Sequence, residues 1–453
     1  MTPNSFAYIV FLVIGALIYH PLSQKAKKPF LLLLNFMFYA IGGVKFLPLL
    51  ALTVAFNFFA AQKLERTERK RGLLTLVLVL NLGALGLFKS LGFFGELLGC
   101  TGVQLSLPQL ALPIGISFYT FVICGYMIDV YRGREAERNF LDFALFTTFF
   151  PAILSGPIER SKSLLPQFKQ PRCANADDVR FAAERLIEGT VKKVLLADNL
   201  AILVNTAYAD PAQFSGLELA FAAVAYALQI YCDFSAYSDM AIGSARLFGI
   251  TLMENFHAPY MAQSSKEFWH RWHISLSTWF RDYVYIPLGG NRCSPARHIF
   301  NLLAVWTLTG FWHGANWTFM AWGLYFGVLL ILEKKFLAGW IARLPSVLQH
   351  LYALFFIVIG WVFFRSDSMG LAVQYLGSMF TSTVPLNRFV IEYLLRFWPY
   401  LLFGVVLSAP VFPRLKSTRI WRVLEFPVLA VLFTLCLMRL LASSYNPFIY
   451  FRF

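Results

Sequence analysis

The stretches KEFWHRWHISLSTWFRDYVYIPLGGNR (266–292) and TGFWHGANWTFMAWG (309–323) place His270, His273 and His313 among aromatic and aliphatic side chains. Ionisable groups are rare inside membranes because each costs about 2.5–3.5 kcal/mol or more at the centre of a spanning helix. In a membrane protein, these three histidines are therefore the first candidates for function.

Composition indicates a membrane protein. Of 453 residues, 58% are hydrophobic, 17% aromatic and only 14% charged, and the mean hydropathy is +0.61. A soluble protein would carry about a quarter charged residues, and a spanning helix needs about 20 mostly apolar ones. The candidate spans are 6–22, 30–43, 46–61, 73–89, 113–130, 140–155, 216–232, 299–312, 317–332, 350–364, 394–410 and 426–442. Several are short or interrupted by Gly and Pro, which predicts broken, tilted or re-entrant helices around an internal cavity.

We therefore expect an all-α, polytopic integral membrane protein with about 11–13 transmembrane or re-entrant helices. It should form a single membrane domain in three parts. Residues 1–110 form peripheral spans, 111–332 form a core richer in polar, Gly, Pro and aromatic residues, and 333–453 return to simple spans. The functional centre should lie in 111–332.

Charge indicates topology. The formal net charge is +15, from 39 basic and 24 acidic residues. Basic residues follow alternate spans, at Lys25, Lys27, Lys28, Lys63, Arg66, Arg69, Lys70, Arg71, Arg132, Arg134 and Arg138. The positive-inside rule then predicts cytoplasmic basic loops and an N-terminus outside. Residues 6–22 read as the first span and not as a cleavable signal peptide, because no basic region precedes them. We expect no nucleic-acid binding, since no basic stripe is separable from this topology signal.

Two connecting segments carry information. Residues 177–200 have an amphipathic pattern, which predicts a helix at the membrane interface with Lys192 and Lys193 reaching toward the headgroups. Residues 151–168, PAILSGPIERSKSLLPQF, contain three prolines and so cannot form one continuous helix.

The histidines allow several chemistries. His313, followed by Gly314 and flanked by Trp312 and Trp317, suits a general base, because a neutral imidazole titrates near working pH. The alternative for His313 is a structural hydrogen bond between helices. His270 and His273 are three residues apart, so both could share one helical face. Together with His313 they could bind zinc or iron, but the spacing is a weak signal, and the six cysteines show no metal or disulfide pattern.

The segment YCDFSAYSDM (231–240) brings Asp233, Ser235, Ser238 and Asp239 into an apolar span. Carboxylates there must pair with cations or face a cavity. We expect either an ion-pair network with Arg246, Arg271 and Arg281 as partners, or a polar lining to a reaction chamber. Arg281 and Asp282 read more as a structural clamp than as catalytic groups.

Several longer runs together resemble one family. They are LPIGISFYTF (112–121), LSGPIER (154–160), KKVLLADNL (192–200), QIYCDFSAYSDMAIGSARLFGI (229–250), ENFHAPYMAQSSKEFWHRWHISLSTWFRDYVYIPLGGNR (254–292) and FWHGANW (311–317). The combination resembles the membrane-bound O-acyltransferases (MBOAT), and most of all the bacterial alginate O-acetyltransferase branch, which is related to the teichoic-acid D-alanyl transfer protein. The resemblance runs from NLGALGLFKS (81–90) to SSYNPFIYFRF (443–453). The chain departs from the branch at His270, where Arg is usual, and at Met253, where proline is common.

The resemblance implies a multi-helix fold with a central tunnel through the bacterial inner membrane. It places the family's near-invariant histidine at His313 and its second catalytic position at His273. His313 would be the base, while His273 would orient it or stabilise the oxyanion. The tunnel and water-excluding lining would then include Trp269, Trp312, Asn316, Trp317, Asp233, Ser238 and Arg281.

The same resemblance implies the substrates. A thioester donor in the cytoplasm, acetyl-CoA or an acyl carrier protein, would give its acetyl group to an extracytoplasmic polysaccharide. The transfer would be direct or through a periplasmic or extracellular SGNH-type acyltransferase partner. We expect no bound cofactor and no metal. Two alternatives stay open: D-alanyl transfer to teichoic acid, and a transporter or flippase in which His273, His313 and Asp233 relay protons. The broken segments show no inverted repeat, which weighs against the transporter.

Overall fold

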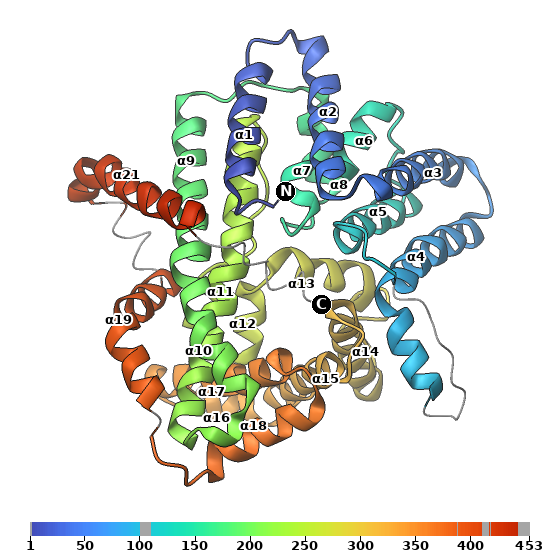
Figure 1. The fold of residues 1–453 in the computed structure, drawn as a ribbon. Helices are drawn as coiled ribbons and strands as arrows, with labels where there is room; N and C mark the ends of the chain where they lie inside the picture. Colours follow the sequence, from blue (N-terminus) through green and yellow to red (C-terminus); the bar gives the residue numbers. More distant parts are fainter. Residues whose placement is uncertain (1, 100–109, 387, 410–415, 417, 443–453) are drawn as a thin grey trace. The chain divides into compact units, whose positions relative to one another are not determined.

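The computed structural model describes residues 2–99, 110–386, 388–409, 416 and 418–442. Every regular element in these residues is helical, which confirms the all-α prediction (Figure 1). Each candidate span overlaps a helix. The C-terminal run SSYNPFIYFRF (443–453) lies outside the described residues.

The chain divides into two compact units. The first comprises Met1–Leu186 and Ser238–Glu254, and the second comprises Ile187–Tyr237 and Asn255–Phe453. The long helix α11 (Gly216–Leu247) contributes its residues 238–247 to the first unit and the rest to the second. The single domain in three parts stays a prediction.

The first unit packs its N-terminal helices through aromatic contacts. The rings of Phe38 and Phe150 both lie within 6.4 Å of the Tyr8 ring, and the Tyr8 hydroxyl donates to Ser244 Oγ at 2.8 Å. Its elements are α1 (Phe6–Tyr19), α2 (Gln24–Gly43), η1 (Val44–Phe46), α3 (Leu47–Arg66), α4 (Lys70–Gly99), α5 (Ile116–Tyr131), α6 (Phe140–Thr148), α7 (Phe150–Ile153), α8 (Ser161–Lys169) and most of α9 (Ala176–Thr190). The predicted break within 151–168 is confirmed: α7 ends at Ile153 and α8 begins at Ser161.

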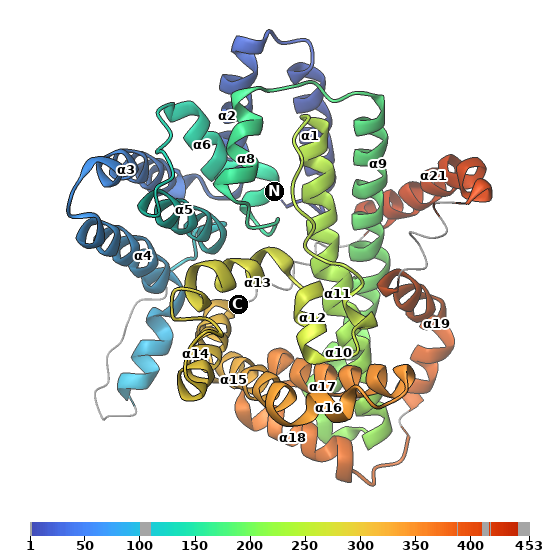
Figure 2. The same cartoon turned by 180° about the vertical axis from the view of Figure 1, so that it is seen from behind.

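The second unit carries the histidine-rich segments, on the helices labelled α12, α13 and α14 in Figure 2. Its further elements are η2 (Val191–Ala197), α10 (Asp198–Ala209), η3 (Pro211–Gln213), η4 (Pro259–Met261), α12 (Ser265–Arg271), α13 (Ile274–Phe280), η5 (Arg281–Tyr285), α14 (Pro295–His313), α15 (Trp317–Leu332), η6 (Glu333–Leu337), α16 (Ala338–Ile341), α17 (Ser346–Arg365), α18 (Met369–Thr381), α19 (Arg388–Ser408) and α21 (Arg419–Ala442). Helices α14 and α15 lie side by side and pack against each other.

Six helical stretches in the described residues are long and apolar enough to cross a membrane. They are Gln24–Arg66, Lys70–Gly95, Gly216–Leu247, Ser346–Arg365, Arg388–Ser408 and Val423–Leu441. The first of these stretches contains two 20-residue helices, α2 and α3, joined by the short turn η1. The chain is therefore a multi-pass membrane protein.

A buried ion-pair cluster corrects the interfacial prediction for Lys193. Its ammonium lies 2.8 Å from Asp233 Oδ1 and 3.0 Å from Asp198 Oδ1, and the Lys193 and Asp233 side chains are each only 3% exposed. Lys193 therefore does not reach for headgroups. An ion-pair network around Asp233 exists, and Lys193, which is not among the predicted partners, is a cation in it. Pairing is required because a carboxylate buried alone is strongly unfavourable.

Lys193→Met should destabilise the protein by about 3–5 kcal/mol, because it leaves Asp233 buried without its cation. Thermal unfolding in detergent measures this loss, and the double variant Lys193→Met with Asp233→Leu should recover most of it. The matched control is Arg388→Met, which breaks the exposed pair of Arg388 with Glu392. Equal losses in Lys193→Met and Arg388→Met would contradict the assigned role.

Candidate functional site

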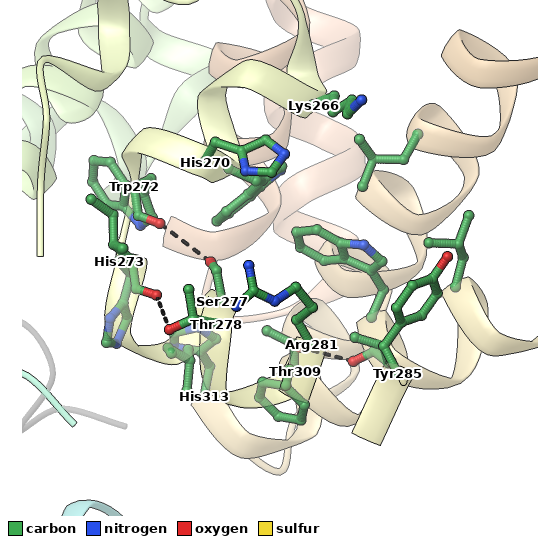
Figure 3. A pocket seen from close by; sticks show the side chains of 18 residues that line it. Lys266, His270, Trp272, His273, Ser277, Thr278, Arg281, Tyr285, Thr309 and His313 are labelled. Atoms are coloured by element: carbon green, nitrogen blue, oxygen red, sulfur yellow. Dashed lines mark hydrogen bonds between the residues drawn. The ribbon is translucent and has the colours of Figure 1, made fainter. Parts of the chain in front are cut away.

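The second unit contains a cavity of about 240 Å³. Its lining comes from α12, α13, η5 and α14, with Trp272 and His273 between α12 and α13 and Leu330 from α15. The polar or ionisable side chains in the lining are Lys266, His270, His273, Ser277, Thr278, Arg281, Tyr285, Thr309 and His313. In Figure 3, Lys266 and His270 lie toward one end of the cavity and His273 and His313 toward the other. The cavity therefore brings together all three histidines that the sequence singled out.

Helix α12 is fixed at its start by two acceptors. The Ser264 hydroxyl accepts the Glu267 N–H at 3.1 Å, which is a standard N-cap. The Glu333 carboxylate, which is buried, accepts the N–H groups of Ser265 and Lys266 at 2.8 and 3.2 Å. A negative charge at a helix N-terminus is favourable because it satisfies free N–H groups and opposes the helix dipole. Glu333 thus ties α12, which carries Trp269 and His270, to the end of α15.

The helix breaks directly before His273. Trp272 is extended, and His273 has φ +44° and ψ +54°, in the left-handed region. The prediction that His270 and His273 share one helical face is therefore wrong, although both side chains line the same cavity. A non-glycine residue in this region costs roughly 1–3 kcal/mol and persists only where neighbours hold it. The break places His273 at the start of α13.

His273 is fully enclosed. Its side chain is 2% exposed, the Phe234 ring meets it edge-on at 4.7 Å, and Asn255 Oδ1 lies 3.3 Å from its Nδ1. The segment 266–285 lies outside the helices long enough to span a membrane. Burial lowers the pKa of His273 to about 3, so the ring is neutral at pH 7.

His313 ends α14 and is held by aromatic rings. Its ring lies 4.8 Å from Trp312, 5.0 Å from Trp322 and 5.2 Å from Phe364, all at steep interplanar angles. The Trp312 ring also lies 6.1 Å from the His273 ring. Both histidines therefore lie beside Trp312 and line the same cavity, in an orientation fixed by packing.

The cavity also has a cationic part. Lys266 and Arg281 contribute positive charge, and burial together with these two cations lowers the pKa of His270. Arg281 pairs with Asp282 at 2.8 Å and still leaves 56% of its side chain exposed. This part of the cavity suits an anionic group.

The remaining sequence-derived site residues, Trp269 and Arg281 apart, do not line the cavity. Asp233 pairs with Lys193, and Ser238 belongs to the first unit. Trp312 supports both histidines without lining the cavity, while Asn316 caps α15 by accepting the Thr318 N–H at 3.2 Å. Trp317 is half-exposed. Their roles in a tunnel stay predictions, whereas Trp269 and Arg281 do line the cavity.

Some site residues escaped the sequence reasoning. Asn255 and Glu333 hold the backbone of the site through hydrogen bonds from distant positions, and Thr309 lies one helical turn before His313. Asn255 belongs to the quoted run 254–292, but nothing in its neighbours predicts its contact with residues 273–275. The searched, described part of the chain contains no group of three or more His, Cys, Asp or Glu side chains placed to hold a metal ion.

Two glycines bring α14 and α15 together. A Cβ at Gly310 would lie 2.3 Å from the Phe319 carbonyl oxygen, and one at Gly323 would lie 2.3 Å from the Trp306 carbonyl oxygen. Small residues at such positions let helix backbones approach closely. Because Gly310 precedes His313 by three residues, this contact sets where the imidazole lies.

Gly310→Ala should therefore lower stability by about 1–3 kcal/mol, since the added methyl group meets backbone that cannot rotate away. The control is Gly339→Ala in α16, where no atom lies within 4 Å of the added methyl group. That change should be neutral or slightly stabilising. The measurement is the unfolding midpoint in detergent, and similar midpoints for the two variants would refute the close-packing interpretation.

Comparison with known proteins supplies the family. The model of the membrane-bound O-acyltransferase family matches residues 130–372, which include the whole cavity. A probable alginate O-acetylase AlgI of Pseudomonas putida is 35% identical over 99% of both chains, and that of Pseudomonas aeruginosa is 39% identical over 83% of this chain and 74% of its own length.

A peptidoglycan O-acetyltransferase of Helicobacter pylori is 35% identical over 82% of this chain and 77% of its own length. Teichoic acid D-alanyltransferases match a smaller share of the chain. The resemblance seen in the motifs is thus confirmed. The chain belongs to the membrane-bound O-acyltransferase family and is a multi-pass membrane O-acyltransferase.

Proposed function

We propose that this chain transfers an acetyl group from a cytoplasmic thioester donor toward hydroxyl groups of an extracytoplasmic polysaccharide, across the bacterial inner membrane. An acetyl group is proposed as the transferred acyl group because the chain is similar, over most of its length, to proteins named as alginate and peptidoglycan O-acetylating enzymes. The proposal includes the tunnel and the external N-terminus expected from the sequence. Transfer is direct or passes through an SGNH-type partner outside the membrane.

One observation carries the chemical proposal: His313 and His273 line the same cavity. His313 takes the proton of the attacking hydroxyl as its oxygen bonds to the thioester carbonyl carbon. The C–S bond then breaks, and the leaving sulfur receives the proton from His313. A positioned general base typically contributes a factor of about 10²–10⁴ in rate.

The surrounding rings favour transfer over hydrolysis. The rings of Trp306 and Phe326 both lie within 5 Å of the Trp269 ring, and Trp269 and Trp306 line the cavity. Excluding water matters because a water molecule would otherwise compete with the acceptor hydroxyl for the thioester.

The cationic part of the cavity supports a phosphate-bearing donor. Both acetyl-CoA and an acyl carrier protein present their thioester on a phosphopantetheine arm. Lys266 and Arg281 would attract its phosphate through their positive charge. The same part of the cavity serves either donor.

D-alanyl transfer to teichoic acid is the second candidate, because D-alanyltransferases are among the relatives. A small acidic carrier protein as the required donor would favour it. The transporter hypothesis requires Asp233 to relay protons together with His273 and His313. Asp233 is paired with Lys193 and does not line the cavity that contains the two histidines, which weighs against this hypothesis.

His313→Ala should abolish acetylation of the polymer while membrane insertion stays normal, because it removes the proposed general base. His273→Ala should be severely impaired. The measurement is the O-acetyl content of secreted polysaccharide in cells with matched membrane levels of each variant. The control is His298→Ala, on the same helix but outside the cavity, where His298 Nε2 contacts Lys334 at 3.0 Å.

Full acetylation in His313→Ala would disprove the mechanism. Unchanged acetylation with less polymer outside the cell would instead indicate transport. A product that carries D-alanyl esters would show that the same site performs the second candidate function, D-alanyl transfer.

A further inference from the structure

Asn255 holds three consecutive residues at the start of α13. Its backbone carbonyl accepts the Ile274 N–H at 3.0 Å, and its side-chain Oδ1 accepts the Ser275 N–H at 3.1 Å. The same Oδ1 lies 3.3 Å from Nδ1 of His273. Asn255 is completely buried, at 0% exposure. These contacts secure the left-handed backbone of His273, which requires such support.

The Ser275 N–H fixes which way the Asn255 amide faces. A backbone N–H can only donate, so the atom opposite it must be the amide oxygen and not the amide nitrogen. With the amide reversed, its NH₂ group would face the Ser275 N–H, donor against donor. The oxygen therefore also faces His273, and Nδ1 of His273 must be the donor in that contact.

A neutral imidazole carries only one proton, so this contact decides the state of the other nitrogen. With hydrogen on Nδ1, Nε2 keeps a free lone pair and is an acceptor. Nε2 is buried and has no hydrogen-bond partner among the described residues. The rings of Phe234 and Trp312 lie beside the imidazole, and burial among them disfavours its doubly protonated, charged form. His273 lines the cavity, whereas Asn255 does not.

We propose that Asn255 is a positioning residue that holds His273 as the neutral Nδ1–H tautomer, so that Nε2 accepts a hydrogen bond from a substrate donor in the cavity. The role of Nε2 rests on the proposed acyl transfer, whereas the tautomer does not. A neutral His273 has no N–H left for an oxyanion. The proposal therefore differs from both roles implied for His273, orienting His313 or stabilising the oxyanion: Nε2 holds the hydroxyl or amide hydrogen of a bound substrate.

The tautomer can be measured without any activity. The full-length protein in detergent is labelled with ¹⁵N-histidine, and the His273 signal among the seven histidines is identified by its loss in His273→Gln. We expect the ¹⁵N shifts of protonated Nδ1 and bare Nε2 at pH 7. Asn255→Asp keeps an oxygen acceptor and should preserve this pattern. Asn255→Ala should shift the signal toward the Nε2–H form or an average of the two.

Kinetics provide the second readout. Asn255→Ala should lower kcat about 10–100-fold, the range found when the hydrogen-bond partners of metal-bound histidines are removed, with little change in KM for the thioester donor. Asn255→Asp should recover part of kcat. The matched control is Asn301→Ala, which removes another fully buried asparagine, one whose amide donates to the Gly290 carbonyl at 3.2 Å. It should lower stability without changing the His273 signal.

An Nε2–H signal in the wild type would overturn the proposal, as would an unchanged His273 signal in Asn255→Ala. If Asn255→Ala does not fold, the wild type and Asn255→Asp decide between these outcomes. Failure of the proposed function is distinguishable, because His313→Ala would then retain acetyl transfer while the His273 tautomer stays as described.

Discussion

The cost of burying a polar group without a partner determines how this protein is built. Most of its interior is aromatic and aliphatic, so a buried charge or amide is stabilised by specific acceptors or donors. Lys193 is placed between two carboxylates, Glu333 accepts two N–H groups of α12, and Asn255 accepts two of α13. The last two contacts support the segment that carries His270 and His273, so the same requirement that stabilises the fold also positions the site.

The helices were predictable because their signals are local. Apolar segments of sufficient length, interrupted by proline at 151–168, are read directly from composition, and the structure follows them. His313 and His273, which the sequence singled out, line one cavity, while their catalytic roles stay predictions. The sequence therefore identified these histidines because an ionisable side chain is costly to bury among apolar residues.

The errors concern partners and local backbone. The spacing of His270 and His273 fits one helical face, but the chain breaks at Trp272, and that break depends on Asn255, which lies 18 residues before His273. Lys193 has the pattern of an interfacial lysine, yet Asp233 lies 40 positions away in sequence and faces it. A periodic pattern shows on which face of a helix a residue lies, but not which residue it contacts. Contacts between residues far apart in sequence cannot be predicted from a short stretch of the chain.

The central claim is that the reacting thioester binds in the cavity that His273 and His313 line. The most direct test is an experimental structure of the protein with a thioether analogue of acetyl-CoA, in which a stable C–S–C linkage replaces the thioester. We expect the sulfur and its acyl-like carbon inside the cavity beside both imidazoles, with the phosphates toward Lys266 and Arg281. An analogue bound outside the cavity, with both histidines still enclosed, would contradict the claim.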